Sequence, residues 1–293
     1  MEWQTRLIST YIKTCELWKQ GISCYVERMS KNDVPDLSDE EIVTIFLNGI
    51  MTGRTSLKGI YNFTANHLAE WFPNLGSYES FVRRLNRISD VFMIYLEMLS
   101  ASAISTIDGS RKLVDSLPIV LANAKRSNKA KVASELADKG YCDSKKMYYY
   151  GVKIHIIGPS RINSIPFPEY IGLSPASCHD IAAFKQIAPE IDNSEIFADK
   201  AYANISDNRC YKAQNNLHVI TPVKLEKGQK RLDSADKLYS TAVSQIRQPI
   251  ESLFNWVQEK TGIQVASKVR SHRGLMVHTF GRLTAGMLML LGF

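Results

Sequence analysis

The sequence predicts an all-helical N-terminal domain, residues 1–103, followed by an α/β domain, residues 104–293, in which helices flank a mixed sheet. Apolar side chains recur at helical spacing through the first part of the chain. From about residue 104, short strand-like runs alternate with helical ones. Three strands are followed by helix, strand, helix, strand and helix, an order that favours a mixed sheet with helices on its faces.

The N-terminal helices have recognisable starting points. Ser38 and Glu41 form a capping box before the run EEIVTIFLNGI, and a further helix starts at Ser77. The apolar residues of that second helix are Tyr78, Phe81, Val82, Leu85 and Ile88, whereas Arg83, Arg84 and Arg87 lie on its other side. A helix with an arginine stripe is what a helix-turn-helix module lays on DNA. The alternative is a solvated face of a packed helical bundle.

The strands and helices of the α/β domain can be placed by apolar runs and turn signals. A basic, polar segment at 124–146 separates the first two strands. The predicted strands are 113–121, 147–158, 169–175, 195–202 and 218–225, and the predicted helices are 180–191, 205–216 and 240–260.

Charge and composition bound the kind of partner. The chain has 36 Lys and Arg against 29 Asp and Glu, a net charge of +7, which suits a polyanion and nucleic acid first. Its five cysteines are odd in number and have no CxxC pair, so we expect free thiols in a reducing cytoplasm. The charged start does not resemble a signal peptide, and the apolar tail LTAGMLMLLGF is too short to span a bilayer. We therefore expect a cytoplasmic protein with no membrane partner.

Three carboxylates occupy positions that such a sheet brings together. Asp115 lies within an apolar strand, Asp199 ends another, and Glu251 lies on the late helix. A charge in an apolar strand is costly to bury unless it is paired or binds a metal. Carboxylates suit Mg²⁺, and two such ions about 4 Å apart can activate the attacking oxygen and stabilise the leaving one in phosphodiester displacement. The pattern predicts a metal-dependent nuclease-type site.

Other acids in the chain have different expected roles. Asp108 precedes Gly109 and Ser110 and is expected in a turn, while Asp180 is expected to cap the helix that follows it. Each acid taken alone has a bland alternative, a helix cap or a surface ion pair. The combination of three acids in this strand order, in a basic protein, is more specific.

At these residues the chain resembles the DDE transposases of bacterial insertion sequences, specifically the insertion-sequence 982 group, which is related to the insertion-sequence 4 type. The resemblance runs from about residue 36 to the end, through LSDEEIVTIFLNGI, SYESFVRRLNRI, LVDSLPIVLAN, KGYCDSKKMYYYGVKIHII, LSPASCHD, FADKAY and RQPIES. It implies a ribonuclease-H-like catalytic domain that uses two Mg²⁺ or Mn²⁺ ions. It also implies cleavage at the terminal inverted repeats of a mobile element and strand transfer into target DNA.

The resemblance assigns the family's three acids to Asp115, Asp199 and Glu251, as both catalytic residues and metal ligands. Insertion-sequence 4 transposases carry a Tyr, Arg, Glu, Lys signature around the third acid. Arg247 stands at the arginine position, whereas the tyrosine position is Ser244 and the lysine position is Gln258; Lys260 could substitute for that lysine. This departure puts the DNA-end contacts near Glu251 in doubt.

Basic residues near the acids are candidates for phosphate contacts, which supply most non-specific DNA affinity. The candidates are Arg247, Lys200, Lys224, Lys260, Arg83, Arg84 and Arg87. For the scattered lysines the alternative is a solvated surface. Tyr202 admits a stacking role on a splayed base.

The expected partner is double-stranded DNA, as element ends and as target, bound by a homodimer because two ends must be brought together. The protein would then be cytoplasmic and nucleoid-associated. Two other functions stay open: a host endonuclease of the same fold, and a DNA-binding protein that has lost catalysis.

Overall fold

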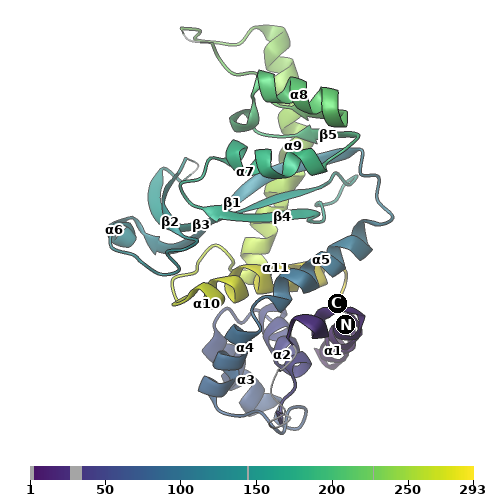
Figure 1. The fold of residues 1–293 in the computed structure, drawn as a ribbon, viewed down its shortest axis with the longest axis vertical. Helices are drawn as coiled ribbons and strands as arrows, with labels where there is room; N and C mark the ends of the chain where they lie inside the picture. Colours follow the sequence, from purple (N-terminus) through teal and green to yellow (C-terminus); the bar gives the residue numbers. More distant parts are fainter. Residues whose placement is uncertain (1–2, 27–34, 144, 227) are drawn as a thin grey trace. The chain divides into compact units, whose positions relative to one another are not determined.

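A computed structural model describes residues 3–26, 35–143, 145–226 and 228–293. The chain forms two compact units (Figure 1), each described by itself below. The helical unit comprises Met1–Ser102 together with Val257–Phe293, and the sheet unit comprises Ala103–Trp256.

The helical unit contains the predicted N-terminal helices and the C-terminal ones. Its elements are α1 (Trp3–Gln20), a short 3₁₀ helix (Ile22–Tyr25), α2 (Asp39–Met51), α3 (Leu57–His67), α4 (Tyr78–Arg87), most of α5 (Val91–Ile104), α10 (His272–Met276), a π-helical turn (Val277–Gly281) and α11 (Arg282–Leu290).

Both predicted helix starts in this unit are confirmed. Before α2, the Glu41 amide donates to the Ser38 hydroxyl at 3.2 Å and the Ser38 amide donates to the Glu41 carboxylate at 2.7 Å, which completes the capping box. Before α4, the Ser80 amide donates to the Ser77 hydroxyl at 3.2 Å. These side chains satisfy amides that have no partner within the helix.

The C-terminal helix α11 is buried within the helical unit. A methyl group added at Gly281 would lie 2.6 Å from the Phe46 ring of α2, and the Thr284 hydroxyl donates to the Phe92 carbonyl of α5 at 3.0 Å. The sequence placed residues 257–293 in the α/β domain, whereas the structure groups them with the N-terminal helices. A helix that is apolar nearly all round must be covered, but its sequence does not say by which partner.

The sheet unit is built on one mixed sheet. Its strand order is β2–β3–β1–β5–β6, with β4 also paired to β3; β5 runs parallel to β1 and β6, and the other pairs are antiparallel. The mixed sheet is as predicted. The strands are β1 (Arg111–Asn123), β2 (Asp138–Cys142), β3 (Met147–Pro159), β4 (Tyr170–Pro175), β5 (Ser194–Phe197) and β6 (Leu217–Ile220).

Helices flank this sheet, also as predicted. They are a short α6 (Ala124–Ser127), α7 (Asp180–Ile187), α8 (Ile205–Asn215) and most of α9 (Ser234–Thr261). Phe184 of α7 packs into a buried cluster with Val114 of β1, Ile196 of β5 and Leu217 of β6. This cluster packs against the segments of β1 and β5 that lead to Asp115 and Asp199.

Candidate active site

Strand register places Asp115 and Asp199 at the same level of the sheet. β1 and β5 are parallel neighbours, and Leu113 is paired with Phe197. Asp115 comes two residues after Leu113, and Asp199 comes two residues after Phe197. The register therefore brings Asp115, within β1, and Asp199, just past the end of β5, to the same level of the sheet.

Asp199 leaves the strand earlier than expected. β5 ends at Phe197, and Asp199 caps the short 3₁₀ helix Lys200–Tyr202, with its carboxylate accepting the Lys200 amide at 2.7 Å. The predicted strand at 195–202 is therefore too long at its C-terminal end. A side chain that can accept its neighbour's amide favours a turn over a continued strand.

Arg247 forms ion pairs with both Asp115 and Glu251. Its Nη1 donates to Asp115 Oδ2 at 2.7 Å, and its Nη2 forms an ion pair with Glu251 Oε1 one helical turn away. The bridge holds α9 beside β1 and keeps Glu251 close to Asp115. Because a guanidinium presents donors in a fixed fork, it can bind two carboxylates at once and offset their mutual repulsion.

The Asp115 carboxylate sits in a poorly solvated position, 22% exposed. Burial raises its pKa to about 6, and the nearby charges of Asp180 and Glu251 act in the same direction. The Arg247 guanidinium and the Ser116 amide, which donates at 2.8 Å, favour the charged form and oppose this rise in pKa. A buried carboxylate with only partial compensation is typical of a functional site.

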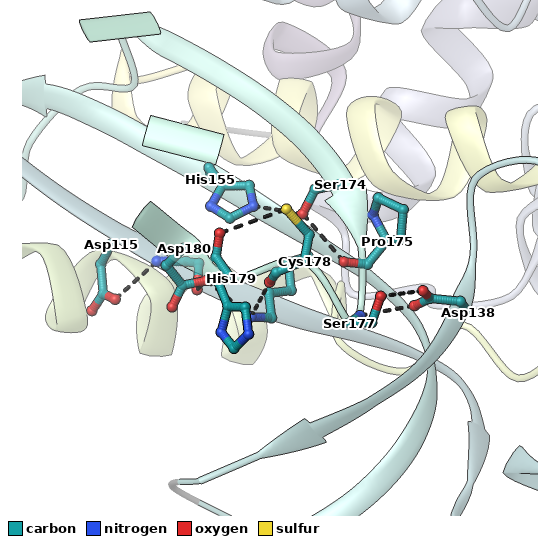
Figure 2. Close-up of polar contacts among 11 residues, drawn as sticks. Asp115, Asp138, His155, Ser174, Pro175, Ser177, Cys178, His179 and Asp180 are labelled. Atoms are coloured by element: carbon teal, nitrogen blue, oxygen red, sulfur yellow. Dashed lines mark hydrogen bonds and ion pairs between the residues drawn. The ribbon is translucent and has the colours of Figure 1, made fainter. Parts of the chain in front are cut away.

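Asp180 is a fourth acid beside this group (Figure 2). Its Oδ1 accepts the Ser116 hydroxyl at 3.0 Å and Lys153 Nζ at 3.0 Å, and the same ammonium donates to the Cys178 carbonyl at 2.8 Å. The expectation that Asp180 caps α7 is wrong: the cap residue is His179, with no side-chain cap bond, and Asp180 begins the helix. Its carboxylate goes to Lys153 instead, because a cation inside an apolar strand needs a partner. That lysine was the sequence signal that could have indicated Asp180.

We expect Asp180→Asn to lower the free energy of unfolding by about 1–3 kcal/mol, because the replacement leaves the poorly exposed Lys153 ammonium without its anion. Thermal and urea denaturation measure the change. Asp207→Asn is the matched control, since Asp207 pairs with the better exposed Lys185 and such pairs contribute about 0–1 kcal/mol. Equal losses in the two variants would contradict a special role for the Lys153–Asp180 pair.

The remaining polar contacts in Figure 2 support the segment around Asp180. His155 shares a hydrogen bond with the Ser174 hydroxyl at 2.7 Å, and burial lowers the pKa of its imidazole to about 4. His155 is therefore neutral at physiological pH and joins β3 to β4. Asp138 of β2 accepts the Ser177 amide at 2.8 Å and so secures the loop before α7.

Tyr202 is buried close to the acids. It is 2% exposed, its ring meets Phe184 edge to face at 5.7 Å, and its hydroxyl has no hydrogen-bond partner among the described residues. Burial raises the pKa of the phenol, and the charges of Asp180, Asp115 and Asp199 raise it further, so the hydroxyl lies within electrostatic reach of these carboxylates. The interpretation of Tyr202 as a platform for a splayed base is wrong, because a buried ring cannot stack on DNA.

A family model described as "Transposase DDE domain" matches residues 105–272, more than half of the chain. The chain belongs to the DDE transposases. The match includes the predicted acids Asp115, Asp199 and Glu251, and it agrees with the mixed sheet and flanking helices of the sheet unit. No curated protein matches the chain.

The acids of this transposase offer hard oxygen donors, which suit the divalent metals that DDE transposases typically use. Within the described residues, no three His, Cys, Asp or Glu side chains are grouped closely enough to hold a metal ion. Arg247 occupies the space between Asp115 and Glu251, and Asp199 binds the Lys200 amide. The oxygen donors suit a metal chemically, but joint ligation requires side chains to turn; Glu251 is half exposed and would have to leave Arg247 to take part.

The predicted DNA contacts fall at different places in the transposase. Arg247 belongs to the acidic site, and Lys200 is exposed beside Asp199. Lys224 is exposed, with its ammonium 3.4 Å from the Ala203 carbonyl, and Lys260 pairs with Glu259 at 2.9 Å. On α4, Arg83 and Arg87 are exposed, whereas Arg84 is held by the Asp39 carboxylate.

Two other expectations concern the whole chain. No disulfide joins the five cysteines, all of which lie in the described residues. No helix among the described residues is long and apolar enough to cross a membrane.

Proposed function

We propose that this DDE transposase cuts the ends of an insertion sequence of the 982 group and joins them to target DNA, with Asp115, Asp199 and Glu251 as its metal ligands. The parallel register of β1 and β5, which sets Asp115 level with Asp199, is the observation that carries the assignment. The fold supports it, because a central antiparallel pair extended by parallel strands is consistent with a ribonuclease-H-like domain.

The chain's own residues divide the work. Asp115 would contact both metal sites, Asp199 one of them and Glu251 the other. Two bound Mg²⁺ or Mn²⁺ ions would supply an activated water or 3′-hydroxyl and would stabilise the leaving oxygen. Neither cutting nor joining needs a covalent protein intermediate.

Arg247 would exchange its partners when the site fills. Its guanidinium now neutralises Asp115 and Glu251, which lets these carboxylates lie close together before metal binds. Once the carboxylates have a stronger cationic partner, the same guanidinium can turn to a DNA phosphate at the rim of the site. Lys200 offers a second cation there.

We expect Arg247→Ala to weaken duplex binding and slow DNA cleavage, by about 10-fold or more, because one charge-assisted phosphate contact is lost. Arg247→Lys should recover the charge but not the two-carboxylate fork, and so restore binding better than cleavage. Gel-shift and single-turnover cleavage assays separate the two effects. Wild-type cleavage by Arg247→Ala would contradict this role.

The function itself is tested by strand transfer. Purified full-length protein is incubated with labelled element-end DNA and a target plasmid, in Mg²⁺, in Mn²⁺ and in EDTA. We expect joined products with either metal and none in EDTA. At least two copies should act together, so the product-forming complex should contain a protein dimer in size-exclusion chromatography with light scattering.

The other outcomes of this assay would indicate other functions. Metal-dependent cleavage without joining would replace the proposal with a host endonuclease of the same fold. DNA binding with neither cleavage nor joining would leave a DNA-binding protein that has lost catalysis.

A further inference from the structure

A cationic cavity lies inside the helical unit. Its volume is about 610 Å³, and no acidic side chain is among the described residues that line it. The segment 262–271 forms one wall, and the start of α3 together with α4 forms another. Its cationic residues are Lys58, Lys268, Arg270 and Arg282. An enclosure with several cations and no anion favours a negatively charged ligand.

Arg282 is the buried member of this set. It is 6% exposed, and its Nη1 and Nη2 donate to the carbonyls of Thr261 and Thr55, while Nε has no hydrogen-bond partner among the described residues. Burial lowers the pKa of its guanidinium only to about 10, so the charge persists at neutral pH. In the described part of the chain no carboxylate pairs with it. A buried charge is costly unless it is paired, and an anion in the cavity would supply the missing partner.

His278 lines the same cavity but adds no charge. Its Nε2 donates to the Ile263 carbonyl at 2.8 Å, and burial together with the Arg282 charge lowers the pKa of the imidazole to about 3. His278 is therefore neutral at physiological pH and leaves the charge of the cavity to its lysines and arginines.

The other cations stand at the exposed edge of the cavity. Lys268 forms no ion pair among the described residues, and Arg270 donates only to backbone carbonyls of its own loop, at 2.7 and 2.8 Å. Lys58 Nζ lies 4.3 Å from the centre of the Tyr78 ring, which orients the ammonium without neutralising it. Lys58 also lies in the first turn of α3, where the amide dipoles add positive potential.

We propose that this cavity binds the phosphate backbone of duplex DNA, with Lys268, Arg270 and Lys58 on successive phosphates and Arg282 as the buried charge behind them. Several separate cations at an open edge suit a chain of phosphates better than one compact anion. The inference rests on the proposed function only in taking DNA as the ligand; it needs no catalysis. It also locates DNA binding away from the predicted arginine stripe of α4, in which Arg84 is already bound to Asp39.

The test is duplex binding by the double variant Lys268→Ala/Arg270→Ala. Binding is measured as the fluorescence anisotropy of a labelled duplex, in EDTA and over a range of salt concentrations. Both side chains are exposed, so the fold should survive, which circular dichroism verifies. We expect about a 10-fold or larger loss of affinity and a fall of about 2 in the slope of log affinity against log salt, since about one counterion is released per phosphate contact.

Lys13→Ala/Lys19→Ala on α1 is the matched control, because it removes the same charge from the same unit but outside the cavity. It should leave both quantities nearly unchanged. Equal losses of duplex affinity in the two double variants would attribute the effect to net charge alone and overturn the proposal. Unchanged affinity in both would also overturn it. ATP serves as a probe for a small phosphorylated ligand. If the wild type binds ATP and Lys268→Ala/Arg270→Ala does not, while the variant still binds duplex DNA normally, the proposal is also overturned in favour of such a ligand.

The outcomes are separable from those for the acidic site. A wild-type protein that binds duplex but never cuts it would sink the proposed function and leave this inference standing. A wild-type protein that cuts and joins, together with a cavity variant that binds duplex normally, would sink only this inference.

Discussion

Asp199→Asn is expected to abolish DNA cleavage and strand transfer while leaving duplex binding intact. The substitution keeps the size of the side chain and can still accept the Lys200 amide, so the short helix after β5 should form. What it removes is the charge needed for metal ligation. Losing several kcal/mol of charge stabilisation in the transition state corresponds to a fall of about 10³-fold or more in rate.

The companion variants Asp115→Asn and Glu251→Gln should behave in the same way, because the three acids act as one unit. Asp108→Asn is the matched control: this exposed aspartate only accepts hydrogen bonds from Ser110 in the turn before β1. It should cut and join at the wild-type rate. Strand transfer retained by Asp199→Asn would remove that residue from the site.

Deletion of residues 263–293 is expected to unfold the helical unit. The deleted segment carries Leu275, Phe280, Leu283 and Leu288, all buried, and α11 packs beside α2. Removing one such side chain costs about 2–5 kcal/mol, so losing all four costs about 8–20 kcal/mol, which is as large as the total stability of about 5–15 kcal/mol of an ordinary domain. Thermal unfolding followed by circular dichroism should lose the cooperative transition of this unit.

Two milder changes calibrate this deletion. Removal of only Gly292 and Phe293, which are not buried, should leave the transition in place. Leu288→Ala should shift it to a lower temperature without abolishing it. If the long deletion unfolds at the wild-type temperature, the C-terminal helices contribute nothing to the helical unit.

Local signals in the sequence were enough for most elements of the sheet unit. An apolar run with one acid inside it predicted β1, and Arg247 and Glu251, which stand four residues apart, share a face of α9. β2 was missed, because DKGYC is short and polar and is a strand only through its pairing with β3. Its Gly140 has no room for a side chain beside the Ala176 carbonyl, a contact that no local pattern announces.

Tertiary partners account for the other differences. The capping expectation for Asp180 was reasonable locally, but Lys153, from a strand 27 residues earlier, takes the carboxylate. Arg247 reaches Asp115 across 132 residues, and nothing near either residue indicates that contact. The cationic cavity is equally non-local, since it joins residues near 58 to residues near 270. The partner that covers the apolar helix α11 is likewise set by tertiary packing and not by the local sequence.

The most direct test of the metal-site claim is DNA cleavage by Asp199→Cys in Mg²⁺ and in Mn²⁺. A thiolate is a poor ligand for the hard Mg²⁺ ion and a better one for Mn²⁺. If Asp199 binds the metal, this variant should be inactive with Mg²⁺ and regain cleavage with Mn²⁺, while the wild type cuts with both. Wild-type cleavage by Asp199→Cys in Mg²⁺ would contradict the account.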